Sequence, residues 1–227
     1  THLSGKQNDL YQAQVQKLIN QLHKQNEKDF KKQRLQVLAE ITKLRELCCD
    51  PHLLYEDYRG KSAKLAATLE LLENSLADGH KVLLFSQFTS MLDIIQKKLQ
   101  KLGMATYVIT GSTPKQKRQA LIKEFNQLNS PAVFLISLKA GGTGINLTSA
   151  DVVIHYDPWW NVAAENQATD RAHRIGQKHN VQIYKMVAKD TIEEKIIELQ
   201  QNKARLAEEV LSGKEFTSGV LDKDDLL

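Results

Sequence analysis

Cysteine, proline and aromatic residues are scarce in this chain of 227 residues. The two cysteines, Cys48 and Cys49, are adjacent, which gives neither a disulfide framework nor the CxxC spacing of a zinc site. Such cysteine usage fits an intracellular protein. No apolar run approaches the roughly 18 residues of a membrane span, and the start of the chain lacks the apolar core of a signal peptide. We therefore expect no membrane partner.

A large charge of one sign is also missing. The net charge is +4, from 31 basic and 27 acidic residues, which is too small by itself to indicate nucleic-acid binding. The length suits one large domain, or one domain with appendages. The first residue is Thr1 rather than a methionine, so we expect the chain to be part of a longer protein.

The chain has no phosphate-binding P-loop of the form GxxxxGK[ST]. Gly60-Lys61-Ser62 comes nearest, but Tyr55 stands where the first glycine is needed and no strand is expected before it. Acidic pairs such as Asp224-Asp225 do not follow a buried strand, as a Walker B carboxylate should. The residues with which an ATPase cradles phosphates and places Mg²⁺ are therefore absent from this sequence.

Residues 1–61 have the pattern of a helical region followed by a linker. Apolar residues recur with helical spacing from Tyr11 to Leu22 and from Val37 to Cys48. Pro51 should end the second helix, because the residue before a proline avoids the helical conformation.

Short apolar runs alternate with helical patterns in residues 62–190. The expected strands are 82–85, 105–109, 132–137, 151–156 and 181–187, and the expected helices are 65–79, 89–102, 114–128 and 162–175. This alternation predicts an α/β fold with a central, mainly parallel sheet flanked by helices. Thr113 and Pro114 predict a helix start, and a capping box at Thr191 begins a C-terminal helix within residues 191–227.

Residues 167–177 place charged groups at helical spacing. One face of the expected helix carries Gln167, Asp170, Arg171 and Arg174. An arginine pair displayed in this way suits a phosphate chain, because each guanidinium is a planar and permanently charged fork of donors. An isolated RxxR pattern is more often an ordinary salt-bridged surface.

The preceding loops favour the phosphate-binding interpretation. AGGTGINL, at residues 140–147, lies between two expected strands, and DPWWN, at residues 157–161, follows the second of them. Glycines let the backbone turn sharply and approach a ligand closely. Loops at the carboxyl ends of parallel strands carry the ligand sites of such folds, so we expect the functional site at this edge.

These segments, in this order, resemble motifs V and VI of superfamily 2 helicases, in the wording of the SWI2/SNF2 branch. VLLFSQFTS, at residues 82–90, resembles motif IV, and the resemblance runs from about Leu35 to Leu199. It implies a RecA-like lobe at residues 62–190, a helical protrusion and linker at residues 1–61, and a brace helix and tail at residues 191–227. It also implies a first RecA-like lobe, with the P-loop and a DExH-type box, N-terminal to Thr1 in the parent protein.

The resemblance implies half of an ATP site. Arg171 and Arg174 match the motif VI arginines, which act as fingers on the γ-phosphoryl group across the cleft, and Gln167 matches the glutamine that orients them or a phosphate oxygen. Gly142 and Gly144 match motif V and should let the backbone approach the nucleotide. Because the missing lobe would hold Mg²⁺ and most of the ATP, we expect the isolated chain to be inactive.

The resemblance also implies contacts with the backbone of double-stranded DNA. The expected contact residues are Gln87, Gly111, Ser112, Thr113, Ser137, Lys139 and Trp160. Such groups hold phosphates without reading bases. A core role is the alternative for Trp160, because tryptophan is usually buried, and Val162 stands where the family has a proline. The histidines lack ligand spacing, so no metal site is expected.

The function implied is that of an ATP-dependent DNA translocase that strips or remodels protein–DNA complexes, with a DNA-bound protein such as RNA polymerase as a candidate target. It would act at the bacterial nucleoid in the cytoplasm, or in the nucleus of a eukaryote. Two alternatives stay open. An RNA helicase lobe would typically end motif VI in HRxGR, where this chain reads HRIGQ. A non-catalytic DNA-binding or scaffold module would have no use for the arginine pair.

Overall fold

The structure is a computed structural model, and it describes residues 1–23, 30–141, 146–170 and 181–211. Five parallel strands form one sheet in the order β2-β3-β1-β4-β5. The strands are β1 (Lys81–Ser86), β2 (Thr106–Ile109), β3 (Ala132–Ser137), β4 (Val152–His155) and β5 (Gln182–Lys185). The predicted α/β fold with a parallel sheet is confirmed.

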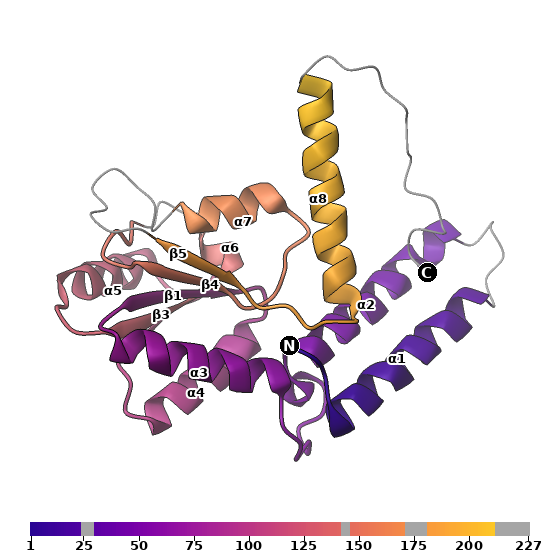
Figure 1. The fold of residues 1–227 in the computed structure, drawn as a ribbon, viewed down its shortest axis with the longest axis horizontal. Coiled ribbons are helices and arrows are strands. Elements are labelled where there is room, and N and C mark those ends of the chain that lie inside the picture. Colours follow the sequence, from indigo (N-terminus) through magenta and orange to yellow (C-terminus); the bar gives the residue numbers. More distant parts are fainter. Residues whose placement is uncertain (24–29, 142–145, 171–180, 212–227) are drawn as a thin grey trace.

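Helices cover both faces of the sheet (Figure 1). One face of β1, with Val82 and Leu84, packs in a cluster with side chains of α3 (Ala63–Ala77) and α4 (Thr89–Lys101). The opposite face, with Leu83 and Phe85, packs in a second cluster. The helices on that side are α5 (Lys115–Gln127), α6 (Leu138–Gly141) and α7 (Val162–Thr169). Burial on both faces explains why the three central strands, β3, β1 and β4, are almost continuously apolar. The edge strand β5 is exposed.

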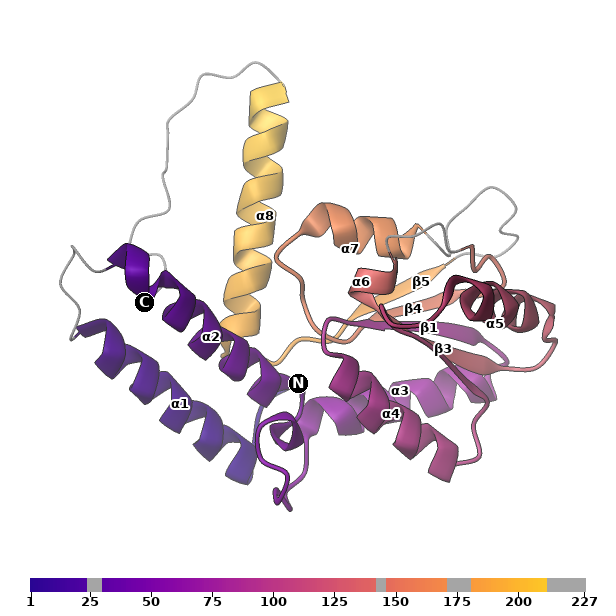
Figure 2. The same cartoon turned by 180° about the vertical axis from the view of Figure 1, so that it is seen from behind.

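The remaining helices lie beside the sheet. Helices α1 (Gly5–His23) and α2 (Phe30–Cys49) run side by side, and α8 (Ile192–Leu211) projects away from the sheet next to α2 (Figures 1 and 2). Helix α2 ends before Pro51, as predicted, and a short 3-10 turn, η2 (Pro51–Leu53), follows. In the described part of the chain, no helix is long and apolar enough to cross a membrane.

Two helix starts differ from their predictions. Helix α5 begins at Lys115 with Pro114 in the capping position, and the Thr113 hydroxyl instead accepts a hydrogen bond from Thr110 N at 3.0 Å. At α8 the Thr191 hydroxyl accepts from Glu193 N at 3.2 Å. The capping box is incomplete there. In a complete box the Glu194 side chain would accept from Thr191 N, but here it accepts from Asp190 N instead.

Candidate functional site

The sheet brings the predicted DNA-contact residues to one edge. Because the five strands are parallel, the loops that follow them leave from the same edge of the sheet. Ser137 is the last residue of β3. The other predicted contact residues come after strands: Gly111, Ser112 and Thr113 after β2, Lys139 after β3, Gln87 after β1 and Trp160 after β4.

The turn after β2 is open to a ligand. Gly111 is exposed, and a Cβ atom added there would meet no atom within 4 Å. Packing within the described residues therefore does not require a glycine at position 111. Close approach of another molecule to the backbone there would require one. Ser112 is also exposed, and its hydroxyl lies 2.9 Å from that of Thr110.

Ser137 is the last residue of β3, and Lys139 comes two residues later. The Ser137 side chain is only 2% exposed, and its hydroxyl has no hydrogen-bond partner within the described part of the chain. Of the predicted contact residues whose exposure is described, it is therefore the least accessible. Lys139 lies in α6, but its side chain is outside the described residues.

The two tryptophans of the loop after β4 differ in their environment. Both side chains are half-buried, but of the two only Trp159 packs against the core cluster around Phe85 and Phe134. Asn161 caps α7, since its side chain accepts from Ala164 N at 3.3 Å. Val162 then occupies the first helical position, which a proline would also suit, so the helix begins without the family's proline.

The predicted ATP-side residues lie almost entirely outside the described part of the chain. Gly142, Gly144, Arg171 and Arg174 are not described. Gln167 is described and lies exposed on α7, two residues before the helix ends at Thr169. The predicted helix over residues 162–175 is therefore observed only in its first part.

Comparison with known proteins identifies the fold family. The sequence pattern of the helicase conserved C-terminal domain matches residues 63–176. The chain also resembles the Sulfolobus solfataricus SWI2/SNF2 ATPase C-terminal domain, with 30% identity and a TM-score of 0.77 over 99% of this chain and 92% of that one. The chain belongs to the SWI2/SNF2 helicase C-terminal domain family.

Two further relatives extend the likeness. The SWI2/SNF2 ATPase core of Sulfolobus solfataricus in complex with dsDNA is 35% identical, with a TM-score of 0.79 over 93% of this chain and 45% of that one. An ATP-dependent helicase of Mycoplasma pneumoniae is 44% identical over 77% of this chain and 17% of its own length. The helicase lobe spans between 17% and 20% of the length of the bacterial curated relatives that it matches.

A buried network in the SWI2/SNF2 lobe ties the DPWWN loop to the other elements. Glu165 of α7 is buried, accepts a hydrogen bond from Trp159 N at 3.3 Å and lies 2.5 Å from Lys185 Nζ of β5. Gln200 of α8 donates to Glu165 at 3.2 Å and also to the Trp159 carbonyl. The sequence analysis missed Glu165. Its position three residues before the buried Ala168, on the same helix face, was the available signal.

His155 is a second buried polar group of this lobe. Its ring stacks on Phe85 with centroids 5.6 Å apart, and its Nε2 lies 2.8 Å from the Thr169 hydroxyl. Burial lowers the pKa of His155 to about 4, and Lys185 adds to this while Glu165 opposes it. The imidazole is therefore neutral at pH 7 and joins β4 to α7 by hydrogen bonding.

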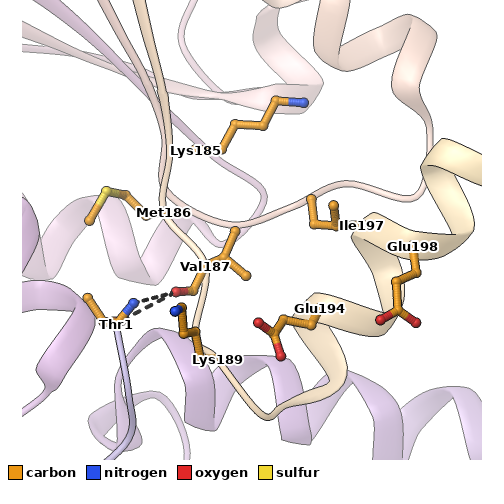
Figure 3. Close-up of a pocket in the computed structure, with 8 residues that line it drawn as sticks. All are labelled: Thr1, Lys185, Met186, Val187, Lys189, Glu194, Ile197 and Glu198. Carbon is orange, nitrogen blue, oxygen red and sulfur yellow. Dashed lines mark hydrogen bonds between the residues drawn. The ribbon is translucent and has the colours of Figure 1, made fainter.

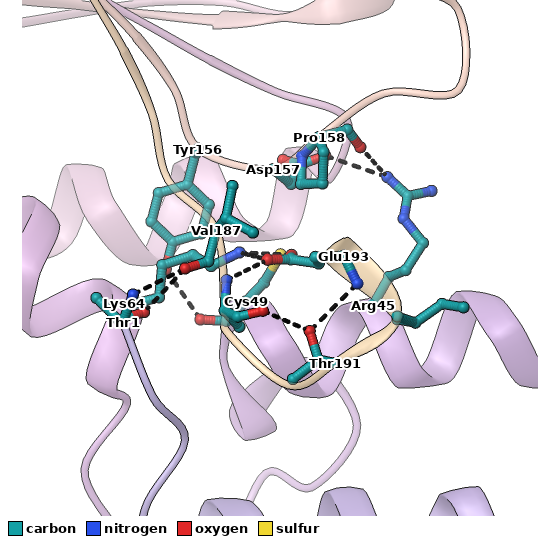
Figure 4. Close-up of polar contacts among 12 residues, drawn as sticks. Thr1, Arg45, Cys49, Lys64, Tyr156, Asp157, Pro158, Val187, Thr191 and Glu193 are labelled. Carbon is teal, nitrogen blue, oxygen red and sulfur yellow. Dashed lines mark hydrogen bonds and ion pairs between the residues drawn. The ribbon is translucent and has the colours of Figure 1, made fainter. Parts of the chain in front are cut away.

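A buried ion pair links α3 to the start of α8 (Figure 4). Lys64 Nζ lies 2.5 Å from Glu193 Oε1, and both side chains are fully buried. Burial raises the pKa of Glu193, and the Lys64 charge opposes this rise. Burial is the largest influence on Lys64 and acts to lower its pKa, but the Glu193 carboxylate together with Cys49 and Cys48 outweighs burial, so that the pKa is raised. The predicted boundaries at residues 61 and 190 stay predictions. The Lys64–Glu193 pair shows that residues 62–190 and the start of α8 share a buried core.

A pocket beside α8 holds none of the predicted site residues (Figure 3). It lies between the end of β5 and the first turns of α8, and Val187, Lys189, Glu194 and Ile197 are among its lining residues. The backbone nitrogen of Thr1 donates to the Val187 carbonyl there at 2.8 Å. Nothing in this pocket connects it with ATP or DNA.

Proposed function

We propose that this chain is the second motor lobe of an ATP-dependent double-stranded DNA translocase. In the complete two-lobe protein, a first RecA-like lobe would bind ATP and Mg²⁺ through its P-loop, and this lobe would close on the nucleotide. The absence of a P-loop from the 227 residues supports such a division.

On the ATP side, Arg171 and Arg174 offset the charge that develops on the γ-phosphoryl group, and Gln167 orients them or a phosphate oxygen. Gly142 and Gly144 let the backbone approach the nucleotide. The exposed position of Gln167 on α7 supports this role, because a buried glutamine could not reach a ligand held by another lobe.

On the DNA side, the loops after β1, β2, β3 and β4 hold one backbone of the duplex. The observation that carries this proposal is that Gln87, Gly111–Thr113, Ser137, Lys139 and Trp160 all lie at or after the ends of strands at one edge of the sheet. Contacts with phosphates and sugars would let the protein move along any sequence. A protein such as RNA polymerase, bound to DNA in a bacterial nucleoid or a nucleus, would be the obstacle displaced.

Strand displacement from duplex DNA that carries a third strand tests this function. We expect the complete two-lobe protein to release the third strand only with ATP, and this chain alone to show neither release nor ATP turnover above background. ATP turnover by the isolated chain that Arg171→Ala removes would contradict the division of the site. ATP turnover without third-strand release by the complete protein would contradict translocation.

A further inference from the structure

Arg45 of α2 joins two of the loops at the DNA-contact edge (Figure 4). Its side chain is 6% exposed. One guanidinium nitrogen donates to the Pro158 carbonyl at 2.8 Å and lies 3.5 Å from Asp157 Oδ2, and the other donates to Gln87 Oε1 at 3.3 Å. The guanidinium also lies 5.5 Å from the ring centre of Phe88. A residue of the N-terminal helices thus contacts both the loop after β1 and the loop after β4.

The two loops also bond to each other around this guanidinium. Asp157 accepts from the Ser86 hydroxyl at 2.5 Å and from Gln87 N at 3.2 Å, and the Gln87 side-chain amide donates to the Pro158 carbonyl at 3.0 Å. Both polar groups of the Gln87 side chain are therefore engaged within the protein. Arg45 donates both to this side chain and to the carbonyl of Pro158, directly before Trp159.

The arrangement requires an arginine. A guanidinium is a rigid planar fork that can donate to a carbonyl, a carboxylate and an amide oxygen at once, whereas a lysine presents one compact ammonium group. Burying a charge is costly unless it is paired, and Asp157 supplies the partner. A lysine at position 45 could keep the pairing with Asp157 but could not hold both loops.

We propose that Arg45 is a positioning residue for DNA binding. It fixes the loops after β1 and β4 relative to each other, so that Gln87 and Trp160 meet the same DNA backbone. The helical protrusion is then part of the DNA-binding machinery rather than an appendage. This inference rests on the proposed function, because only that proposal assigns DNA contacts to Gln87 and Trp160.

The tryptophans provide a direct probe, since Trp159 and Trp160 are the only two in the chain. Acrylamide quenching of their fluorescence reports how firmly the loop after β4 is held, and a short, labelled duplex of mixed sequence reports DNA affinity. We expect Arg45→Lys to increase quenching and to weaken duplex binding by about fivefold or more. Addition of Gln87→Ala to this variant should weaken duplex binding by less than about a further twofold, because both side chains act through one arrangement.

Glu193→Gln is the matched control, because Glu193 is equally buried but bonds to Lys64 and to Ala188 N rather than to either loop. It should lower stability and leave quenching and DNA affinity unchanged. A folded Arg45→Lys variant with the quenching and affinity of the parent would overturn the proposal, and so would equal losses in Arg45→Lys and Glu193→Gln.

A second variant covers the case in which Arg45→Lys does not fold. Gln87→Met removes both the bond from Arg45 and the bond to the Pro158 carbonyl, whereas Gln87→Glu keeps an acceptor for Arg45 and loses only the bond to Pro158. Greater quenching in Gln87→Met than in Gln87→Glu supports the proposal, and equal quenching in the two variants rejects it. If Gln87→Ala and Trp160→Ala both bind the duplex as the parent does, the DNA contacts of the proposed function are wrong. The quenching of Arg45→Lys then still decides whether Arg45 holds the loops.

Discussion

At the scale of single residues, stability should be most sensitive to the loss of one partner of a buried ion pair. Lys64 and Glu193 are both fully buried and form an ion pair between α3 and α8. Removal of one partner leaves an uncompensated charge in the core, which typically costs about 3–5 kcal/mol. Glu193→Ala should therefore lower the free energy of unfolding by about that amount, measured by urea denaturation.

The double variant Lys64→Met with Glu193→Leu is the informative control. Replacement of both charges by apolar groups should recover most of the loss, because no charge is left unpaired. If the double variant is instead as unstable as the sum of the two single variants, the pair is not the origin of the effect.

His155 makes stability depend on pH. Its pKa is lowered from 6.5 to about 4 by burial, so between these values the unfolded chain binds a proton that the folded chain excludes. The free energy of unfolding should therefore fall as the pH drops from 6.5 to about 4, by up to about 3 kcal/mol. Above pH 6.5 this residue should have no effect.

His155→Phe should remove this part of the pH dependence, since a phenyl ring can still stack on Phe85 but cannot titrate. Denaturation curves for parent and variant at pH 4.5 and pH 7 measure the difference. Equal pH dependence in the two proteins would mean that other groups, such as the carboxylates, account for it.

At the scale of helices and strands, the hydrophobic pattern predicted the five strands and most helices to within a residue or two. Continuous apolar runs such as residues 132–137 identify strands buried on both faces. The helix starts at Lys115 and Ile192 lie within one residue of the prediction, but the capping hydrogen bonds there differ, because side chains bond within turns that the sequence does not reveal. The short helix α6 was not predicted, since four residues are too few for a periodic pattern.

The two tryptophans of the loop after β4 have different proposed roles, Trp160 in DNA binding and Trp159 in core packing. Trp159→Ala removes a side chain from the core cluster and should cost about 3 kcal/mol of stability or more. Trp160→Ala should change stability much less and should instead lower the ratio of DNA-stimulated to unstimulated ATP turnover in the complete protein. If the two variants lose stability equally and both keep full DNA stimulation, Trp160 belongs to the core.

Helix α6 carries the proposed phosphate contact of Lys139. Lys139→Ala should reduce the slope of log affinity against log salt by about one counterion, because one phosphate contact is lost. Sequence preference should not change. Lys98→Ala is the control, since Lys98 is exposed in the last turn of α4, away from the loops that follow the strands, and its replacement should leave the slope unchanged. Equal slopes for Lys139→Ala and the parent would remove Lys139 from the DNA contact.

At the scale of the whole molecule, the site could be predicted only in part. The motif order identified the loops, and the parallel sheet explains why they share one edge. The sequence could not reveal Arg45 and Gln200, because each contacts a segment far from it in the chain. Half of the proposed ATP site belongs to another lobe, so neither the sequence nor the fold of this lobe completes it.

The central claim is that this lobe completes the ATP site of a motor with its arginine pair. ATP turnover at saturating duplex DNA, measured for Arg171→Ala and Arg174→Ala in the complete two-lobe protein, tests it most directly. We predict a fall of about 10³-fold or more for each variant, as for other arginine fingers, with a much smaller change in ATP affinity. Turnover by both variants within about twofold of the parent would contradict the claim.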